Sequence, residues 1–142
     1  MNAPRVGVVI PTMQAGRHLE KLLPALRGQS MPPHTIVVID SSSVDDTAEQ
    51  ARQAGAIVEV IPRAEFDHGA TRNRGAVLAG DVDILVFMAQ DALPVERGFL
   101  ARLVLPLVEG TAAAAFARQV PCPHASPSEV FARFRNYPAA SQ

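Results

Sequence analysis

The chain of 142 residues has 13 basic and 14 acidic side chains, and its net charge of −1 offers no general attraction to nucleic acid or acidic lipid. Its one cysteine, Cys122, excludes an internal disulfide framework and suits a reducing compartment. No apolar run approaches the roughly 20 residues that a membrane helix needs, so we expect a soluble cytoplasmic domain with no nucleic-acid partner.

Apolar runs and amphipathic stripes alternate along most of the chain. In chain order they predict a strand over 6–10, a helix over 16–27, a strand over 35–39, a helix over 43–54, a strand over 57–61, a helix over 69–78, a strand over 84–88, a helix over 96–108, a strand over 112–117 and a short helix over 129–135. This alternation is typical of βαβ units. Because the strands are continuously apolar, we expect an α/β fold of three layers, with a mostly parallel central sheet covered on both faces.

Local signals indicate where several of these helices begin and end. Pro24 lies inside the first helical pattern and should kink or shorten that helix. The residues from Ser43 to Asp46 have the spacing of a capping box, so the second helix should begin there and stop at Gly55. Gly80 should end the third helix, and Pro106 should bend the fourth.

Prolines cluster in the last part of the chain. Three of them lie within seven residues from Pro121 onward, and a short helical stretch follows. The segment has too little apolar material for a core of its own. We therefore expect residues 1–120 to form the α/β unit, and residues 121–142 to form a Pro-rich loop and a short helix.

Polar side chains follow the strands at one edge of the predicted sheet. Ligands of open parallel sheets bind outside the carboxyl ends of the strands. The candidates there are Pro11 and Thr12 after the first strand, Asp40 and the serines 41–43 after the second, Gln90 and Asp91 after the fourth, and Arg72 and Asn73 on the intervening helix. Carboxylates, hydroxyls and a guanidinium suit a nucleotide, and a divalent cation on Asp91 would neutralise a diphosphate.

Motifs of several other nucleotide-binding and hydrolytic folds are absent. The first strand is followed by "IPTMQAG" rather than by G-x-G-x-x-G, which disfavours a dinucleotide redox fold. The sequence contains no G-x-x-x-x-G-K-[ST] of a P-loop NTPase and no G-x-S-x-G of a serine hydrolase. No pair of cysteines or histidines has the spacing of zinc ligands.

Five segments in order carry a resemblance to a known family. The strings "VGVVIPTMQAGRHLEKLLPALRGQS" and "TIVVIDSSSVDDT" resemble the opening of the family 2 inverting glycosyltransferases, which have a GT-A fold. The strings "FDHGATRNRGA", "VFMAQDALP" and "ARQVPCP", with "NYP" after the last predicted helix, resemble the rhamnosyltransferase branch of that family. The resemblance covers nearly the whole chain, and residues 1–120 would then be its nucleotide-sugar-binding half.

The resemblance implies roles for particular residues of this sequence. Pro11 and Thr12 would lie beside the base and the ribose, Asp40 would bind the nucleobase, and Arg72 would contact it from the other side. Asp91 matches the last acid of the D-x-D motif, which holds Mg²⁺ or Mn²⁺ on the diphosphate. Ala89 stands at the first acid of that motif, so the chain supplies one carboxylate where many relatives supply two. His68 would contact a phosphate or the sugar.

Each candidate also has a purely structural interpretation. Asp40 and Asp91 could cap the loop or helix that follows each of them. Arg72 could be an ordinary exposed helix arginine, and His68 could be a loop histidine bonded to the backbone.

The resemblance also implies an activity and its partners. The full-length enzyme would transfer a sugar, rhamnose in this branch, from a dTDP- or UDP-sugar to a polysaccharide or lipid-linked acceptor, with inversion at the anomeric carbon. A lipid-linked acceptor would bring it to the inner face of the membrane as a peripheral protein. The family's general base lies in a later part of the domain that this chain does not contain, so the catalytic residue stays unassigned. Apolar surface left open by a half-domain would favour a homodimer.

Two rival functions remain from the residues. A non-catalytic nucleotide-sugar-binding module would bind the nucleotide without turnover, and the missing base favours it. A nucleotidyltransferase would need a Gly-rich basic loop after the first strand, whereas "PTMQAGRH" contains one glycine and one arginine.

Overall fold

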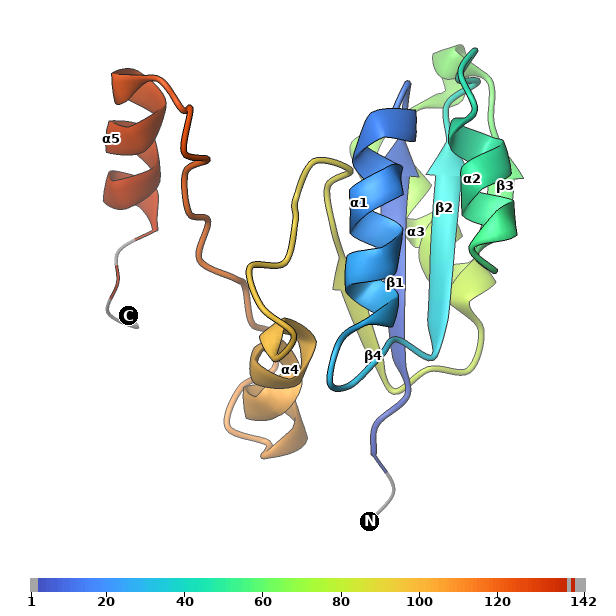
Figure 1. The fold of residues 1–142 in the computed structure, drawn as a ribbon. Coiled ribbons are helices and arrows are strands. Elements are labelled where there is room, and N and C mark those ends of the chain that lie inside the picture. Colours follow the sequence, from blue (N-terminus) through green and yellow to red (C-terminus); the bar gives the residue numbers. More distant parts are fainter. Residues whose placement is uncertain (1–2, 138, 140–142) are drawn as a thin grey trace. The chain divides into compact units, whose positions relative to one another are not determined.

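The computed structural model describes residues 3–137 and residue 139. Its elements are β1 (Val6–Thr12), α1 (Gly16–Arg27), β2 (Thr35–Asp40), α2 (Thr47–Gln53), β3 (Ile57–Val60), the 3-10 helix η1 (Arg63–Glu65), α3 (His68–Ala79), β4 (Ile84–Phe87), α4 (Phe99–Val108) and α5 (Pro127–Asn136). The alternation of strands and helices predicted for residues 6–108 is thus confirmed (Figure 1).

The four strands form one parallel sheet with the order β3-β2-β1-β4. β1 lies between β2 and β4, and its register pairs Thr12 with Asp40 and Gly7 with Leu85. Since all four strands are parallel, their carboxyl ends lie at one edge of the sheet. This arrangement brings the polar residues that follow β1, β2 and β4 together.

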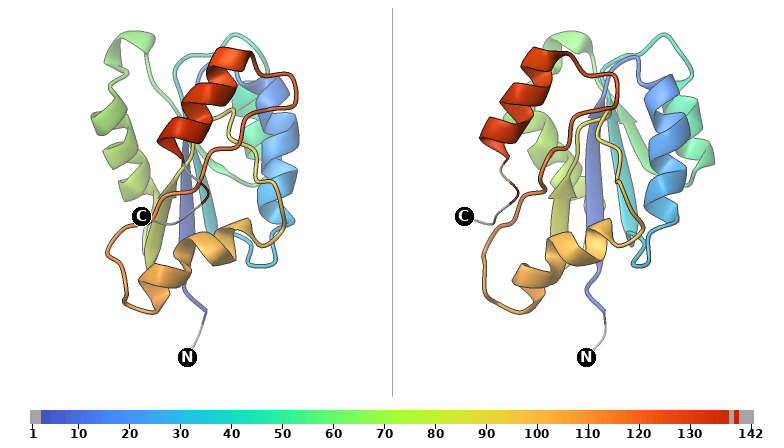
Figure 2. Two further views of the ribbon diagram at one scale, coloured as in Figure 1. Left: turned by 90° about the vertical axis from the view of Figure 1, so that its left-hand side faces the viewer. Right: turned by 60° about the vertical axis from the view of Figure 1, so that its left-hand side comes forward.

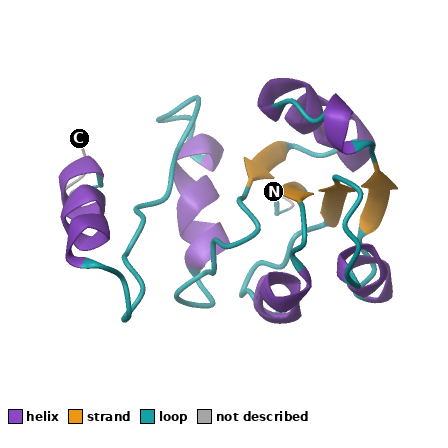
Figure 3. Ribbon diagram, turned by 90° about the horizontal axis from the view of Figure 1, so that it is seen from above, coloured by secondary structure: helices purple, strands orange, loops and turns teal. Residues whose placement is uncertain are grey.

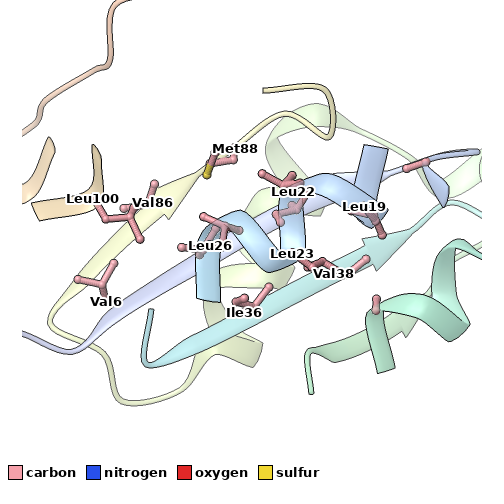
Figure 4. Close-up of a cluster of buried hydrophobic side chains, with 14 of the residues drawn as sticks. Val6, Leu19, Leu22, Leu23, Leu26, Ile36, Val38, Val86, Met88 and Leu100 are labelled. Carbon is pink, nitrogen blue, oxygen red and sulfur yellow. The ribbon is translucent and has the colours of Figure 1, made fainter. Parts of the chain in front are cut away.

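Helices cover both faces of the central strands. α1 and α2 lie on one face of the sheet and α3 lies on the other (Figures 2 and 3). Along β1, Val8 and Ile10 belong to the core cluster on the α1 side, whereas Val9 belongs to the cluster on the α3 side. This period of two buries β1 and β2 on both faces, as the continuous apolar runs predicted. Figure 4 shows the larger cluster, in which the α1 leucines pack on the strands.

A glycine allows α3 to approach the sheet closely. A Cβ atom added at Gly75 would overlap the side chain of Val9 on β1. The absence of a side chain at this position therefore sets the distance between α3 and the central strand. Because α3 begins at the carboxyl edge of the sheet, the same contact also positions the first residues of the helix beside the candidate site.

The edge strand β4 differs from the prediction. Val86 faces the α1 side and is buried with Leu100 and Val104, but Leu85 and Phe87 point the other way and are 37% and 45% exposed. α3 packs mainly on the neighbouring strands β1 and β2, which leaves this face of the edge strand partly exposed. The expectation that the fourth strand is buried on both faces was therefore wrong for the chain as it stands.

Two local predictions also need correction, and one is confirmed only in part. The first helix has the predicted range, Gly16–Arg27, so Pro24 does not shorten it, and the alternative of a kink stays a prediction. The predicted strand over 112–117 is an irregular segment. The last long helix begins at Phe99 rather than at residue 96. The third helix does end at Gly80, whose φ of 70° lies in the left-handed region that glycine adopts at little cost.

The capping box predicted at Ser43 does not form. α2 begins four residues later, at Thr47, and Asp46 precedes it without a side-chain capping bond. The Ser43 hydroxyl instead donates to Asp40, 2.6 Å away, and accepts from the backbone N–H of Gln14. A tertiary contact has therefore replaced the local one.

The chain divides into two compact units, Met1–Val104 and Leu105–Gln142. In the second unit α5 begins with a true capping box, in which Ser126 and Glu129 bond each other's backbone N–H. The two bonds from Ser126 lower the pKa of the Glu129 carboxyl. Pro138, the last residue of "NYP", lies outside the described residues. No helix in the part of the chain that is described is long and apolar enough to cross a membrane.

Candidate functional site

A cavity of about 290 Å³ lies where β1, β2 and β4 end. Ten residues line it, all from the first unit: Pro11, Thr12, Met13, Ser41, Arg63, Phe66, His68, Arg72, Ala89 and Gln90. They come from the ends of three strands, from the segment between β3 and α3, and from the first turns of α3. The cavity therefore lies at the edge that the rule for parallel sheets predicts.

The lining of the cavity combines cations with apolar surface. Arg63 and Arg72 contribute guanidinium groups, His68 contributes an imidazole, and Phe66 contributes an aromatic ring. None of the ten lining residues is an acid. Guanidinium groups bind phosphate through paired hydrogen bonds, and flat aromatic surface suits a stacked ring. The cavity thus suits an anionic ligand that carries a planar group.

The beginning of α3 is held by its capping residue. Asp67 precedes the helix and accepts hydrogen bonds from the backbone N–H groups of Gly69, at 2.9 Å, and Ala70, at 2.8 Å. These two bonds lower the pKa of the Asp67 carboxyl. Because the cap satisfies the first free amides of the helix, it fixes the place where His68 enters the cavity wall.

Three side chains along this wall contact one another. The rings of Phe66 and His68 meet edge to face with their centroids 4.9 Å apart. One helical turn later, the Arg72 guanidinium donates to the His68 carbonyl oxygen at 2.9 Å and lies 3.3 Å from its Nδ1. Arg72 therefore lies along the wall of the cavity instead of extending into solvent.

Asp40 is buried and fully engaged with the protein. Its side chain is at the end of β2 with 1% exposure. Oδ1 accepts from the hydroxyls of Thr12, at 2.9 Å, and Ser43, and Oδ2 accepts from the Ser43 backbone N–H at 2.9 Å. Asp40 is not among the residues that line the cavity. Its carboxylate thus joins the end of β1 to the loop after β2.

Ser41 is the serine of the 41–43 run that faces the cavity. Its side chain is buried, with 3% exposure, and its hydroxyl has no hydrogen-bond partner in the described structure. The neighbouring Ser42 adopts a left-handed φ of 52° and turns its hydroxyl to the carbonyl oxygen of Ile61, 2.8 Å away. A buried polar group without a partner is uncommon and costly, so the Ser41 hydroxyl is available for a ligand.

The loop between β1 and α1 is held by side chains from other loops. Four consecutive backbone N–H groups are each bonded in this way: Met13 to Gln90, Gln14 to Ser43, Ala15 to Thr47 and Gly16 to Asp45. These amides are therefore not free to bind a triphosphate. The loop differs in this respect from the phosphate-binding loop that a nucleotidyltransferase would need.

Asp45 makes one of these bonds and has a further partner in Thr47. The Thr47 hydroxyl donates to Asp45 Oδ1, and Gly16 at the start of α1 donates to Oδ2 at 3.1 Å. These bonds lower the pKa of the Asp45 carboxyl, with the Thr47 hydroxyl making the largest contribution. Asp45 is exposed, and its carboxylate links the start of α1 to the loop before α2.

Asp91 occupies an exposed turn next to the cavity. The backbone N–H of Ala92 donates to the carbonyl oxygen of Ala89 at 3.1 Å, which closes a turn with Gln90 and Asp91 at its centre. Within residues 3–137 the Asp91 carboxylate has no hydrogen bond or ion pair. It lies beside Gln90, which lines the cavity, without lining the cavity itself.

The described residues contain no group of three or more His, Cys, Asp or Glu side chains that could hold a metal ion. A complete protein-made metal site is therefore not present among them. Mg²⁺ needs only one or two carboxylates when phosphate oxygens and water supply its other ligands. The single Asp91 carboxylate fits this mode, in which the ion arrives with a diphosphate.

Nine of the residues singled out from the sequence divide into two groups. Pro11, Thr12, His68, Arg72 and Gln90 line the cavity, whereas Asp40, Ser42, Asn73 and Asp91 do not. Asn73 is exposed on α3. Four lining residues were not among the candidates from the sequence, namely Met13, Arg63, Phe66 and Ala89, and Ser41 was named only within the run of serines 41–43. Two of these residues could have been found from the sequence. Ser41 adjoins Asp40 in the same polar run, and the aromatic Phe66 adjoins the capping residue Asp67.

Comparison with protein families decides the assignment. The model of the family described as "Glycosyl transferase family 2" matches residues 7–135. The chain belongs to this family. Two relatives of the family are named O-antigen chain rhamnosyltransferases: RfbN of Salmonella typhimurium, 33% identical over 138 residues, and WbaN of Salmonella anatum, 33% identical over 135 residues. The matches cover 96% and 94% of this chain but 44% and 43% of those proteins, so the chain spans less than half their length.

Two solved structures share the fold of this chain. Glucosyl-3-phosphoglycerate synthase from Mycobacterium tuberculosis, solved with Mn²⁺, UDP and glucosyl-3-phosphoglycerate, is 25% identical with a TM-score of 0.59, over 74% of this chain and 40% of that one. The mannosyltransferase PcManGT from Pyrobaculum calidifontis, solved with GDP-Man and Mn²⁺, is 27% identical with the same TM-score, over 72% and 32%. These matches confirm the GT-A fold that the resemblance implied.

Proposed function

We propose that this chain is the donor-binding part of a glycosyltransferase that transfers rhamnose from a dTDP- or UDP-sugar to a polysaccharide or lipid-linked acceptor, with inversion. The O-antigen rhamnosyltransferases that match nearly the whole chain support the choice of sugar and acceptor. The Mn²⁺ and nucleotide ligands of the structural neighbours support a divalent cation and a nucleotide-sugar donor.

The observation that carries the proposal is the unpartnered Ser41 hydroxyl in a cavity lined by aromatic and cationic side chains. A pyrimidine base would place its ring against the apolar wall that Phe66 and Pro11 contribute, and a polar atom of the base would pair with Ser41. Such a bond would remove the cost of leaving that hydroxyl buried without a partner. In this proposal Asp40 does not contact the base. It holds Thr12 and the loop that presents Ser41 to the base.

The phosphates of the donor would lie toward the cationic part of the wall. Arg72 and Arg63 would bind phosphate oxygens, and His68 would supply a further donor beside them. Asp91, at the rim, would hold Mg²⁺ or Mn²⁺ together with the diphosphate oxygens. When bound, the cation neutralises negative charge on the leaving nucleoside diphosphate. The guanidinium groups add to this stabilisation where they are partly shielded from water.

Calorimetric titration of the 142-residue chain with dTDP, UDP and GDP, each with and without Mn²⁺, tests the proposal. We expect dTDP or UDP to bind more tightly than GDP and to bind more tightly with Mn²⁺ than without it. Asp91→Asn should abolish the effect of Mn²⁺ and leave metal-free binding intact. Asp46→Asn is the matched control, because Asp46 is also an exposed loop aspartate and does not line the cavity. Absence of binding to all three nucleotides would reject the donor site.

A second function, that of a non-catalytic nucleotide-sugar-binding module, is favoured by one observation: no acid lines the cavity. Such a module would bind the nucleotide but would neither transfer nor hydrolyse the sugar. A turnover assay with a dTDP- or UDP-sugar and a glycan acceptor separates the two functions. Release of nucleoside diphosphate that depends on the acceptor supports the transferase, and tight binding without release supports the module.

The proposal extends to the surroundings of the protein. We place the enzyme in the cytoplasm, at the inner face of the membrane when its acceptor is lipid-linked. The uncovered side chains Leu85 and Phe87 on β4 would support a homodimer of the chain. Sedimentation of the chain with and without anionic vesicles checks both expectations.

A further inference from the structure

The side-chain amide of Gln90 bonds the backbone of Met13 through both its oxygen and its nitrogen. Gln90 Oε1 accepts from the Met13 N–H at 2.9 Å, and Gln90 Nε2 donates to the Met13 carbonyl oxygen at 3.1 Å. The sequence suggested that Gln90 binds the donor directly. Its oxygen and its nitrogen instead pair with the N–H and the carbonyl oxygen of one residue, Met13.

This pair lies just beyond the end of the sheet. The last backbone bond from β4 to β1 runs from the Met88 N–H to the Val9 carbonyl oxygen at 3.0 Å. The corresponding bond from β2 runs from the Ser41 N–H to the Thr12 carbonyl oxygen at 2.8 Å. Met13 follows both and lies beyond the last backbone bond on either side. Gln90 therefore joins β1 to the segment after β4 beyond the last backbone bond between them, with a side chain in place of backbone.

The same glutamine lies at the centre of the turn that carries Asp91. The bond from the Ala92 N–H to the Ala89 carbonyl oxygen closes this turn, and Gln90 and Asp91 are its two central residues. Consecutive Cα atoms are about 3.8 Å apart, so anchoring Gln90 also restricts where the Asp91 carboxylate can lie. In the described structure Asp91 has no anchor of its own. Its position relative to the cavity thus depends on the bonds between Gln90 and Met13.

We propose that Gln90 is a positioning residue that holds the Asp91 turn against the β1–α1 loop, and so keeps Asp91 within reach of the donor diphosphate. The functional half of this inference rests on the role proposed above for Asp91. The structural half, that Gln90 orders the turn, stands on the geometry alone. Gln90 itself makes no contact with the donor and acts only through Asp91.

The replacement Gln90→Met tests the proposal. Methionine is similar in length and unbranched, but it cannot make either bond to Met13. Gln53→Met is the matched control, because Gln53 lies on the exposed face of α2 and bonds only Glu49 of the same helix. Gln90→Glu is a conservative variant, because it keeps the acceptor for the Met13 N–H and loses the donor.

The first measurement is amide hydrogen exchange of the free chain, which needs no ligand. In Gln90→Met the amides of Met13 and Ala92 should exchange about tenfold faster or more, whereas those of the core strands should be unchanged. Gln90→Glu should retain protection at Met13, and Gln53→Met should match the original chain. Unchanged exchange at Ala92 in Gln90→Met would overturn the proposal.

The second measurement is the ratio of the dTDP dissociation constants without and with Mn²⁺. We expect Gln90→Met to lower this ratio about tenfold and to leave metal-free binding within about twofold. If Gln90 merely stabilised the fold, its replacement would lower the melting temperature without changing this ratio of dissociation constants. If the original chain shows the Mn²⁺ effect and Gln90→Met keeps it, positioning through Asp91 is wrong. If the original chain binds no nucleotide, the proposed function and the functional half of this inference both fail, and hydrogen exchange decides the structural half.

Discussion

Thr12 and Asp40 end neighbouring parallel strands in register, and the Thr12 hydroxyl donates a hydrogen bond of 2.9 Å to Asp40 Oδ1. Both side chains are buried, at 3% and 1% exposure. The pair therefore closes the sheet at the edge where the cavity begins. Loss of this hydrogen bond would change the shape of the site, even though the bond itself does not contact a ligand.

Replacing Asp40 by asparagine should destabilise the chain by about 2 kcal/mol, because it leaves a buried donor unsatisfied. One oxygen of the new side chain can still accept from Thr12, but its NH₂ group would face the Ser43 N–H that now donates to Oδ2. Urea unfolding measures the difference, with the exposed Asp46→Asn as the control. An unfolding free energy equal to that of the original chain would contradict the role of Asp40 as a buried brace.

Replacing Ser41 by alanine should have opposite effects on stability and on binding. The hydroxyl is buried without a partner among the described residues, so its removal should leave the free energy of unfolding unchanged or slightly higher. Nucleotide binding should weaken by about tenfold, the loss expected for one hydrogen bond. Thermal unfolding and calorimetry measure the two quantities. A stable variant that binds dTDP and UDP as tightly as the original chain would show that Ser41 does not contact the base.

Replacing Gly75 by alanine should destabilise the fold by about 1–3 kcal/mol, because the added methyl group would overlap Val9. Val9→Ala makes room on the opposite side, so the double variant should recover part of the loss from Gly75→Ala. Gly98→Ala is the control, since nothing lies within 4 Å of a Cβ atom there. Additive losses in a double-mutant cycle would argue against the close contact of α3 with β1.

The Asp45 carboxylate should stabilise the chain only above acidic pH. Its bonds to Thr47 and Gly16 lower its pKa from the ordinary 3.8, so the folded state binds the proton more weakly than the unfolded state does. The stabilisation is therefore present above that ordinary value and is lost as the pH falls through the lowered one.

The replacement Asp45→Asn tests this pH dependence. The variant should be less stable than the original chain at pH 7 and should approach its stability as the pH falls below about 3.8. Urea unfolding at several pH values measures the gap, and Asp46→Asn serves as the control. A gap that stays constant down to acidic pH would mean that the charge of Asp45 does not contribute.

The sequence by itself determined the order of the elements and the edge of the sheet where the site lies. Continuous apolar runs such as 6–10 and 35–39 are typical of central parallel strands, and short-range signals such as Gly80 act within one turn of the chain. The polar residues after those strands are therefore expected at one place before any contact is known. His68, Arg72 and Thr12 lie there, as the topology requires.

The tertiary structure alone decided what each polar side chain does at that edge. The Ser43 hydroxyl does not cap α2 but accepts from the backbone N–H of Gln14, 29 residues earlier in the sequence. The left-handed turn at Ser42 directs Ser41, rather than its neighbours, to the cavity. Gln90 finds its partner in Met13, 77 residues earlier in the sequence. A hydrogen-bond partner so distant in sequence leaves no periodic pattern in the chain, and only the packed sheet brings the two residues together.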